Sequence, residues 1–412
     1  MSRLFRPLRK INTHRITKHA HHDAIQSTGD AIMPPSKATD ILGNRPEPLI
    51  YDASGSAAHL STEADQPHRC RMLAWSLSGF QKAAVIGNAT TGRAWHMASD
   101  EGPNLNGWDA APPPLGFLTV GLATAFAEEI QQLASNRGMA TGALQIAVDN
   151  YYSVTGSMRA RTMFGGALPF SVAVGTEYDV DDLDLFQLVR DGVHVSSVAG
   201  LFRDQTQGRF RVILNGTEIE LSHPAPLGVV ADPVDQCHAT SAAAHGEALL
   251  ASDGWSTKST GAAPLHVLAA GETRANGSLA LRQELKAPCG SAWRFVAGGA
   301  AAPDALSYVS AGIGFCFMTQ LEILAAMHDV PVDALRLVQD TAFGPGGATG
   351  GTGKSPGFAP VETHLFVDAP RATAAQVSEL VDLAERACYL HALCRTSVKP
   401  LVRSAGTKRK AS

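Results

Sequence analysis

Cysteine is scarce in this 412-residue sequence, which holds six of them. They are Cys70, Cys237, Cys289, Cys316, Cys388 and Cys394. No two of them form a CxxC pair and all are widely scattered, which excludes a fold held together by disulfides. We therefore expect free thiols in a cytoplasmic, reducing setting, where any disulfide would be transient or catalytic.

Strong charge bias and long apolar runs are also lacking. The net charge is −4, so electrostatics favour neither nucleic acid nor an acidic membrane as a partner. The most apolar stretch, residues 306–327, contains Ser, Gln and Glu, which indicates a buried core helix rather than a membrane span. Metal-ligand spacing is absent among the histidines of residues 223–266. We expect no metal and no cofactor.

The composition favours a globular fold with basic ends. Apolar residues make up 45% and charged residues 17% of the chain, and its length suggests two domains. Residues 1–69 are predicted to be a basic, disordered segment. Its first 32 residues have the character of a transit peptide or of a basic tail, unless translation starts at Met33. Residues 406–412 are predicted to be a short basic tail.

An internal repeat organises the rest of the chain. "GRAW" at 92–95 recurs as "GSAW" at 290–293, and each is followed by a proline and a long apolar helix. Aligning Pro112 with Pro303 places Gly121 on Gly312 and Ala125 on Cys316. Repeats of this kind indicate a duplicated structural unit.

The similarity continues downstream of these helices. Residues 165–198 and 356–393 each contain a strand of alternating pattern, which predicts one buried face, then a capping turn and a second amphipathic helix. Cys388 falls in the second of these helices, with Val193 as its counterpart. We predict two copies, at 70–222 and 263–405, joined by a linker at 223–262, with the cysteine pair only in the C-terminal copy.

A proline-led helix with a central cysteine, then a strand and a helix with a second cysteine, resembles the OsmC/Ohr family of osmotically inducible and organic-hydroperoxide-resistance proteins. The stretch 99–123 is similar to the family's lead into its first long helix. The resemblance implies an α+β fold in which curved antiparallel sheets surround two long central helices in an intimate dimer. Two OsmC-like domains in one chain would form an intrachain pseudo-dimer, and further dimerisation is possible.

The resemblance also implies a reaction and its residues. Cys316 would attack an organic hydroperoxide and become a sulfenic acid, Cys388 would condense with it to a disulfide, and an external dithiol would reduce the pair. The family activates the first thiol with an arginine, for which Arg274 is our candidate and Arg294 the reserve. The family's helper glutamate would fall on Leu306.

Other interpretations remain open. Cys394 could compete with Cys388, and Tyr389 stands where the family usually has proline. A non-catalytic OsmC-like protein binding a small apolar ligand is the main alternative, and an acyl-transfer enzyme ranks last because no His–Asp arrangement accompanies Cys316. The glycine-rich stretch 344–358 lacks P-loop spacing, and from its position we expect a loop that could cover Cys316.

Overall fold

The structure is a computed structural model that describes residues 38–45, 47–56, 60, 68–223, 226–235, 248–255, 264–288 and 290–404. Most of the predicted N-terminal segment and of the linker lies outside the described residues, as do the basic tail, Cys237 and Cys289. The remainder is an α+β fold.

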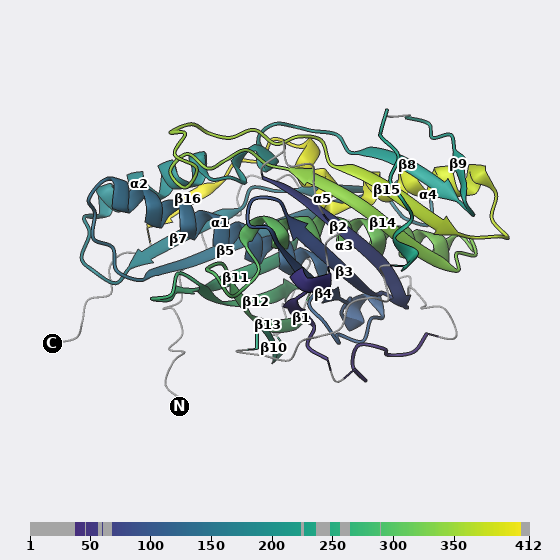
Figure 1. Cartoon of the computed structure of the whole chain (residues 1–412), viewed down its shortest axis with the longest axis horizontal. Helices are drawn as coiled ribbons and strands as arrows, with labels where there is room; N and C mark the ends of the chain where they lie inside the picture. The colour runs from purple at the N-terminus through teal and green to yellow at the C-terminus, as the bar shows by residue number, and fades with distance from the viewer. Residues whose placement is uncertain are drawn as a thin grey trace. The chain divides into compact units, whose positions relative to one another are not determined.

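Figure 1 labels most of the helices and strands of the first half. They are β1 (Ile50–Asp52), β2 (Arg69–Ser78), β3 (Gln81–Asn88), β4 (Arg93–Ser99), α1 (Pro114–Asn136), β5 (Leu144–Thr155), β6 (Phe164–Ala167), β7 (Ser171–Thr176), α2 (Asp182–Val195), β8 (Arg209–Leu214) and β9 (Thr217–Ile219). Four short 3-10 helices are described: η1 (Ser54–Ser56), η3 (Pro103–Leu105), η4 (Ala199–Phe202) and η5 (Pro233–Asp235).

The second half has a similar order, but its described residues form no strands that match β6 and β9, and it has one more α-helix. It contains β10 (Leu250–Trp255), β11 (Leu265–Thr273), β12 (Leu279–Ala287), β13 (Ser291–Ala297), α3 (Ala305–Met327), β14 (Ala334–Ala342), β15 (Glu362–Asp368), α4 (Ala374–Ala387), α5 (Tyr389–Arg395) and β16 (Leu401–Ser404).

Each of the two sheets is built from both halves. One has the order β1-β4-β3-β2-β14-β15-β8-β9, and the other has the order β10-β13-β12-β11-β5-β7-β16, with β6 paired to β5. In each sheet, antiparallel strands from one half pair with two strands of the other half, through β2 and β14 in the first sheet and through β11 and β5 in the second. The next strand pairs in parallel: β8 with β15 in the first sheet, and β16 with β7 in the second. The two predicted halves are therefore interleaved, and neither has a sheet of its own.

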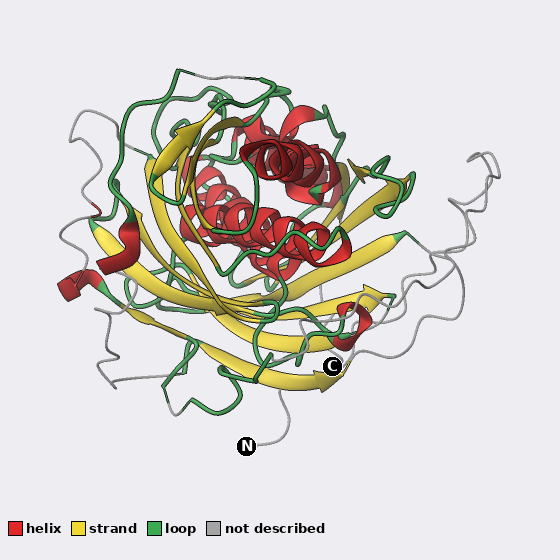
Figure 2. Cartoon of the chain, turned by 90° about the vertical axis from the view of Figure 1, so that its right-hand side faces the viewer, coloured by secondary structure: helices red, strands yellow, loops and turns green. Residues whose placement is uncertain are grey.

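The sheets curve around the helices, as Figure 2 shows. Helices α1 and α3 are each 23 residues long and pack against each other in the centre. Of the described helices, α3 alone has the length and composition of a membrane span, but 89% of its most apolar window is buried inside the fold. It is a core helix, as the sequence predicts.

Two glycines allow α1 and α3 to approach closely. A Cβ added to Gly121 would lie 2.8 Å from the backbone nitrogen of Val309, and a Cβ added to Gly312 would lie 2.8 Å from the backbone nitrogen of Leu118. Either distance is shorter than real Cβ contacts. Gly121 and Gly312, which the sequence repeat aligns, thus each lie close to the backbone of the other central helix where α1 and α3 cross.

Two local predictions were wrong. Strand β15 is buried along both faces rather than on one, because it lies between β14 and β8 inside a covered sheet. The predicted single helix around Cys388 is two helices: α4 begins with a capping box at Thr373 and ends at Ala387, and α5 begins at Tyr389. Cys388 itself is extended, with φ −66° and ψ 121°, which ends α4.

Candidate active site: a buried pair of thiols

Cys316 and Cys388 lie side by side. Their Sγ atoms are 3.4 Å apart, and both are free thiols in the interior. Cys316 is in the middle of α3, and the extended backbone at Cys388 turns its side chain from the α4–α5 junction toward that helix. A disulfide has a sulfur–sulfur distance of about 2.0 Å, so a small movement would join the pair.

A histidine that the sequence interpretation missed contacts this pair. His391 Nδ1 is 3.3 Å from the Sγ of Cys388. The ring packs against both Phe210 and Phe317, with centroid distances of 5.6 Å and 5.2 Å, and its Nε2 is buried without a hydrogen-bond partner among the described residues. The available signal was the spacing in "CYLH", because residues three apart on a helix are neighbours.

The two thiols have opposite electrostatic environments. Burial opposes ionisation of Cys388, but the Cys316 thiol and the His391 ring together lower the pKa of Cys388 well below its ordinary value. Burial raises the pKa of Cys316, and the negative charge on Cys388 raises it further, against the backbone amide of Leu390. These directions make Cys388 the more acidic thiol of the pair.

Arg274 does not lie at the thiols. The residue at the start of β11, Leu265, pairs with Tyr152 of β5, whose ring is 5.7 Å from that of Tyr389 beside Cys388. Strand β11 is nine residues long, which is about 30 Å at about 3.3 Å per residue. Arg274 follows its other end, in the turn to β12, where its amide donates to the carbonyl of Ser278.

The reserve candidate, Arg294, also has its ion-pair partner away from the thiols. Arg294 lies on β13 with a side chain that is 55% exposed, and it forms an ion pair with Asp253 of β10 at 2.7 Å. In the described part of the chain, the nitrogen-bearing side chain that contacts a thiol of this pair is His391.

A buried carboxyl group approaches Cys316 from the first half of the chain. Thr319, one turn beyond Cys316 on α3, donates its hydroxyl to Oε1 of Glu101 at 2.8 Å. Leu306 stands where the sequence led us to expect a helper carboxyl, and nearby Asp304 instead caps α3 by accepting from the amide of Ser307 at 3.0 Å. The carboxyl near Cys316 thus comes from the segment after β4, which the sequence interpretation did not identify.

Glu101 belongs to a buried charge cluster around Lys82. Lys82 is fully buried on β3, and its Nζ lies 3.0 Å from Oε2 of Glu322 on α3. The same Nζ donates to the carbonyl of Phe80 at 2.6 Å. Burial raises the pKa of Glu101 and that of Glu322 to about 7, although the positive charge of Lys82 counteracts it. Asp100, next to Glu101, also has a raised pKa because of burial.

The raised carboxyl pKa values predict a loss of stability with rising pH. Between about pH 4.5 and 7 the folded state keeps protons on Glu101 and Glu322 that the unfolded chain releases, so the free energy of unfolding falls as pH rises. One pKa unit corresponds to about 1.4 kcal/mol, and a decrease of a few kcal/mol is expected. We expect Glu101→Gln to flatten this slope in urea unfolding across that range.

A matched control is Glu379→Gln, because Glu379 is 47% exposed and pairs with Arg161 on the surface. It should leave the slope unchanged. Equal slopes for wild type and Glu101→Gln would contradict the prediction.

A segment of the first half covers the Cys388 junction. The Nη2 of Arg395 donates to the carbonyl of Gly165 at 3.2 Å, and the Nε of Arg386 donates to that of Met163 at 3.2 Å. A Cβ on Gly165 would lie 2.4 Å from the carbonyl oxygen of Ala387, so only glycine fits this close approach. Residues on both halves of the chain therefore enclose the thiols.

The glycine-rich stretch 344–358 lies elsewhere, and the predicted cover over Cys316 was wrong. Its Thr349 hydroxyl donates to Oε2 of Glu129 on α1 at 2.6 Å, and its Gly347 amide donates to the carbonyl of Val195 on α2 at 2.8 Å. These contacts place it against the C-terminal parts of α1 and α2.

Two residues of the first half match the thiols by their positions in the helices. Ala125 and Cys316 occupy the same position counted from the start of α1 and α3. Cys388 caps α4 at its C-terminus, and the residue that caps α2 in the same extended conformation is Ser196. The predicted counterpart, Val193, is instead buried within α2.

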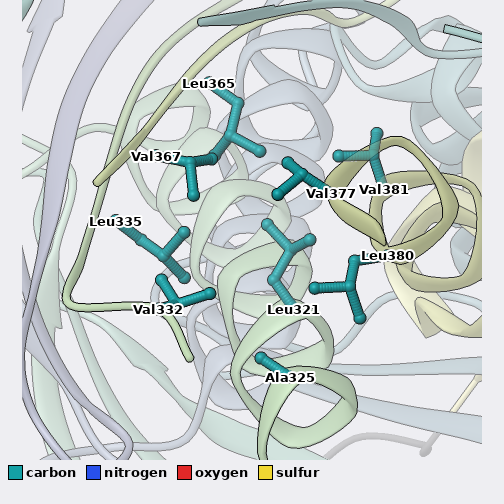
Figure 3. A pocket seen from close by; sticks show the side chains of 9 residues that line it. All are labelled: Leu321, Ala325, Val332, Leu335, Leu365, Val367, Val377, Leu380 and Val381. Atoms are coloured by element: carbon teal, nitrogen blue, oxygen red, sulfur yellow. The ribbon is translucent and has the colours of Figure 1, made fainter. Parts of the chain in front are cut away.

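The described cavities lie outside the thiol pair. A crevice between α3, α4, β14 and β15, drawn in Figure 3, has a volume of about 10 Å³ and only aliphatic walls. It is at the lower limit for one water molecule. A second cavity of about 310 Å³ lies on the outer face of β2 and β4 beside Tyr51, Trp75 and His96. Neither is lined by Cys316 or Cys388.

Comparison with known families matches a part of the second half of the chain. The family model described as OsmC-like protein matches residues 298–401. This range includes α3, α4 and α5 and therefore both thiols and His391. No curated protein and no solved structure matches the chain.

Proposed function

We propose, from the premise that residues 298–401 are an OsmC-like domain, that the chain is a two-cysteine peroxidase that reduces organic hydroperoxides to alcohols. The observation that supports it most is the 3.4 Å separation of the Cys316 and Cys388 sulfurs in the interior. Two unrelated packing cysteines have no need to meet, whereas a dithiol that cycles through a disulfide requires contact.

The reaction consumes two thiols for each peroxide. One thiolate attacks the terminal oxygen of ROOH, the O–O bond breaks, and the products are ROH and a sulfenic acid. The second thiol displaces water from the sulfenic acid and forms the Cys316–Cys388 disulfide. An external dithiol then reduces this disulfide by exchange. Aromatic and aliphatic side chains around the sulfurs, such as Phe210 and Phe317, favour an organic hydroperoxide over hydrogen peroxide.

We also propose that the chain arose as a tandem duplication that forms a pseudo-dimer. The shared order of elements in the two sheets and the reciprocal contacts of Gly121 and Gly312 support this, because a two-fold interface repeats each contact from both sides. In such a dimer the first half, which lacks the cysteine pair, contributes walls to the site. The residues of the first half that would form these walls are Glu101, Tyr152 and Gly165.

The alternative is a non-catalytic protein that binds a small apolar ligand. The cavity of about 310 Å³ beside Trp75 favours it, since its volume suits a small molecule. In that case the thiols would be packing residues.

One experiment separates the two functions. Reduced protein is treated with one equivalent of cumene hydroperoxide, and its disulfides are mapped by non-reducing peptide mass spectrometry. We expect rapid loss of the peroxide and a Cys316–Cys388 bridge. Cys70→Ser is the matched control, because Cys70 is a buried free thiol on β2 and its loss should change neither result. Persistent peroxide with reduced thiols would rule out the peroxidase.

A further inference from the structure

We propose that the cavity of about 310 Å³ on the outer face of β2 and β4 is a binding site for a small aromatic carboxylate, and that Arg45 binds its carboxylate group. We call this site the outer cavity. The inference is independent of the peroxidase, because the outer cavity and the thiols lie on opposite faces of one sheet. On β4, Trp95 belongs to the core cluster that contains Cys316, whereas its neighbour His96 lines the outer cavity.

The roof of the outer cavity is a segment that is anchored at both ends. At one end the amides of Ile41 and Leu42 donate to Oε1 of Gln81 at 2.8 Å and 3.0 Å. At the other end β1 pairs with β4, and Tyr51 lies opposite His96. Between these anchors the described residues 43–45 and 47–48 are exposed. The cavity is therefore preformed, as small-molecule sites usually are.

A small residue on β4 keeps the outer cavity open. Ala98 contributes only a methyl group, whereas the other lining residues of β2 and β4, which are Trp75, Leu77 and His96, are large. Folded interiors contain few voids larger than a water molecule. A volume of about 310 Å³ instead lies at the lower end of the range for small-molecule sites, about 300–1,000 Å³. The size fits a ligand of one or two fused rings.

Three aromatic side chains determine what the walls accept. The rings of Tyr51 and His96 are stacked with 4.4 Å between their centroids, and the ring of Trp75 stands at 60° to that of His96, 6.2 Å away. Burial, and to a lesser extent the positive charge of Arg45, lowers the pKa of His96 to about 4, so this ring is neutral at pH 7. Neutral aromatic walls favour a flat apolar ring that stacks against them.

Arg45 provides the charge that selects an anionic ligand. It lines the cavity from the exposed roof, and its guanidinium forms no ion pair within the part of the chain that the structure describes. Its charge also acts on His96, which places it near the aromatic walls. Arginine binds a carboxylate through two parallel N–H···O bonds. Glu47 lines the cavity as well, so an aromatic cation is the competing ligand.

Isothermal titration calorimetry with three naphthalene probes of similar size tests the ligand class. The probes are 2-naphthoate, the neutral 2-naphthamide and the cation 2-naphthylmethylammonium, each titrated into the full-length protein without peroxide. We expect 2-naphthoate to bind with a Kd between about 1 and 100 μM, at least about tenfold more tightly than the other two. Equal affinities for 2-naphthoate and 2-naphthamide would overturn the inference. So would tighter binding of the cation, or no binding of 2-naphthoate at about 1 mM.

Variants test the location of the site. We expect Arg45→Gln to weaken 2-naphthoate at least about tenfold and to leave 2-naphthamide unchanged. Ala98→Val fills part of the cavity and should weaken both probes, with folding verified by circular dichroism. The matched control is Arg190→Gln, because Arg190 is 60% exposed on α2 and should affect neither probe. Affinity for 2-naphthoate that is unchanged in Arg45→Gln, or that falls equally in Arg190→Gln, would overturn the assignment.

Discussion

Gly312→Ala is expected to destabilise the protein by about 2–3 kcal/mol, since overpacking of a dense core has costs in this range. The new methyl group would lie 2.8 Å from the backbone nitrogen of Leu118 and 3.0 Å from the carbonyl oxygen of Pro114. Both atoms belong to the backbone of α1, so no side chain can move aside and the two central helices must separate. The gain in helix propensity, about 1 kcal/mol, only partly offsets this. Urea unfolding measures the difference.

Gly314→Ala is the matched control on the same helix. Its Cβ would approach the Sδ of Met72 at 2.5 Å, and this flexible thioether can adopt another rotamer. We expect a clearly smaller loss of stability than for Gly312→Ala. If the two variants were equally stable, backbone contact at the crossing would not limit the packing of α1 and α3.

Lys82→Met is expected to cost about 3–5 kcal/mol at pH 7.5, because removing one partner of a buried ion pair leaves the other charge uncompensated. Lys82 is fully buried, and its Nζ contacts Glu322 at 3.0 Å. Without this cation the carboxyls of Glu101 and Glu322 must take up protons in order to fold. The penalty should therefore shrink at pH 5, where both carboxyls are protonated in the wild type as well.

Two further variants define the origin of that effect. In Lys82→Met/Glu322→Gln the uncompensated charge is removed, and we expect a large part of the stability to return. Lys286→Ala removes a surface cation that is 36% exposed and pairs with Glu284 at 3.0 Å, for which less than about 1 kcal/mol is expected. A loss in Lys82→Met that is independent of pH would contradict the electrostatic explanation.

Much of the central architecture was readable from the sequence. Gly121 and Gly312 were aligned by the repeat, and both lie at the crossing of α1 and α3. Such positions are visible because a close helix approach tolerates only glycine. The interleaving of strands was not readable in detail, since β14 pairs with β2, far away in the chain, and local periodicity carries no information about distant partners.

The two cysteines of the site could be predicted from the sequence, but the polar side chains around them could not. The cysteine spacing marked Cys316 and Cys388, which the structure brings together. His391 escaped because its role depends on the break between α4 and α5, which the extended Cys388 creates without proline or glycine. Arg274 was selected by local similarity, but its position is determined by the direction and length of β11. Glu101 reaches α3 only through tertiary packing.

The interleaved sheets have a consequence for how the protein responds to dilution. In an assembly of two separate chains, strands such as β14 and β5 would join their sheets only after a bimolecular encounter, and the melting temperature would depend on protein concentration. Here β2 and β14 meet within one polypeptide, so the encounter is intramolecular and its effective concentration is set by the connecting chain. The enclosure of the thiols by both halves thus persists even where the protein is scarce.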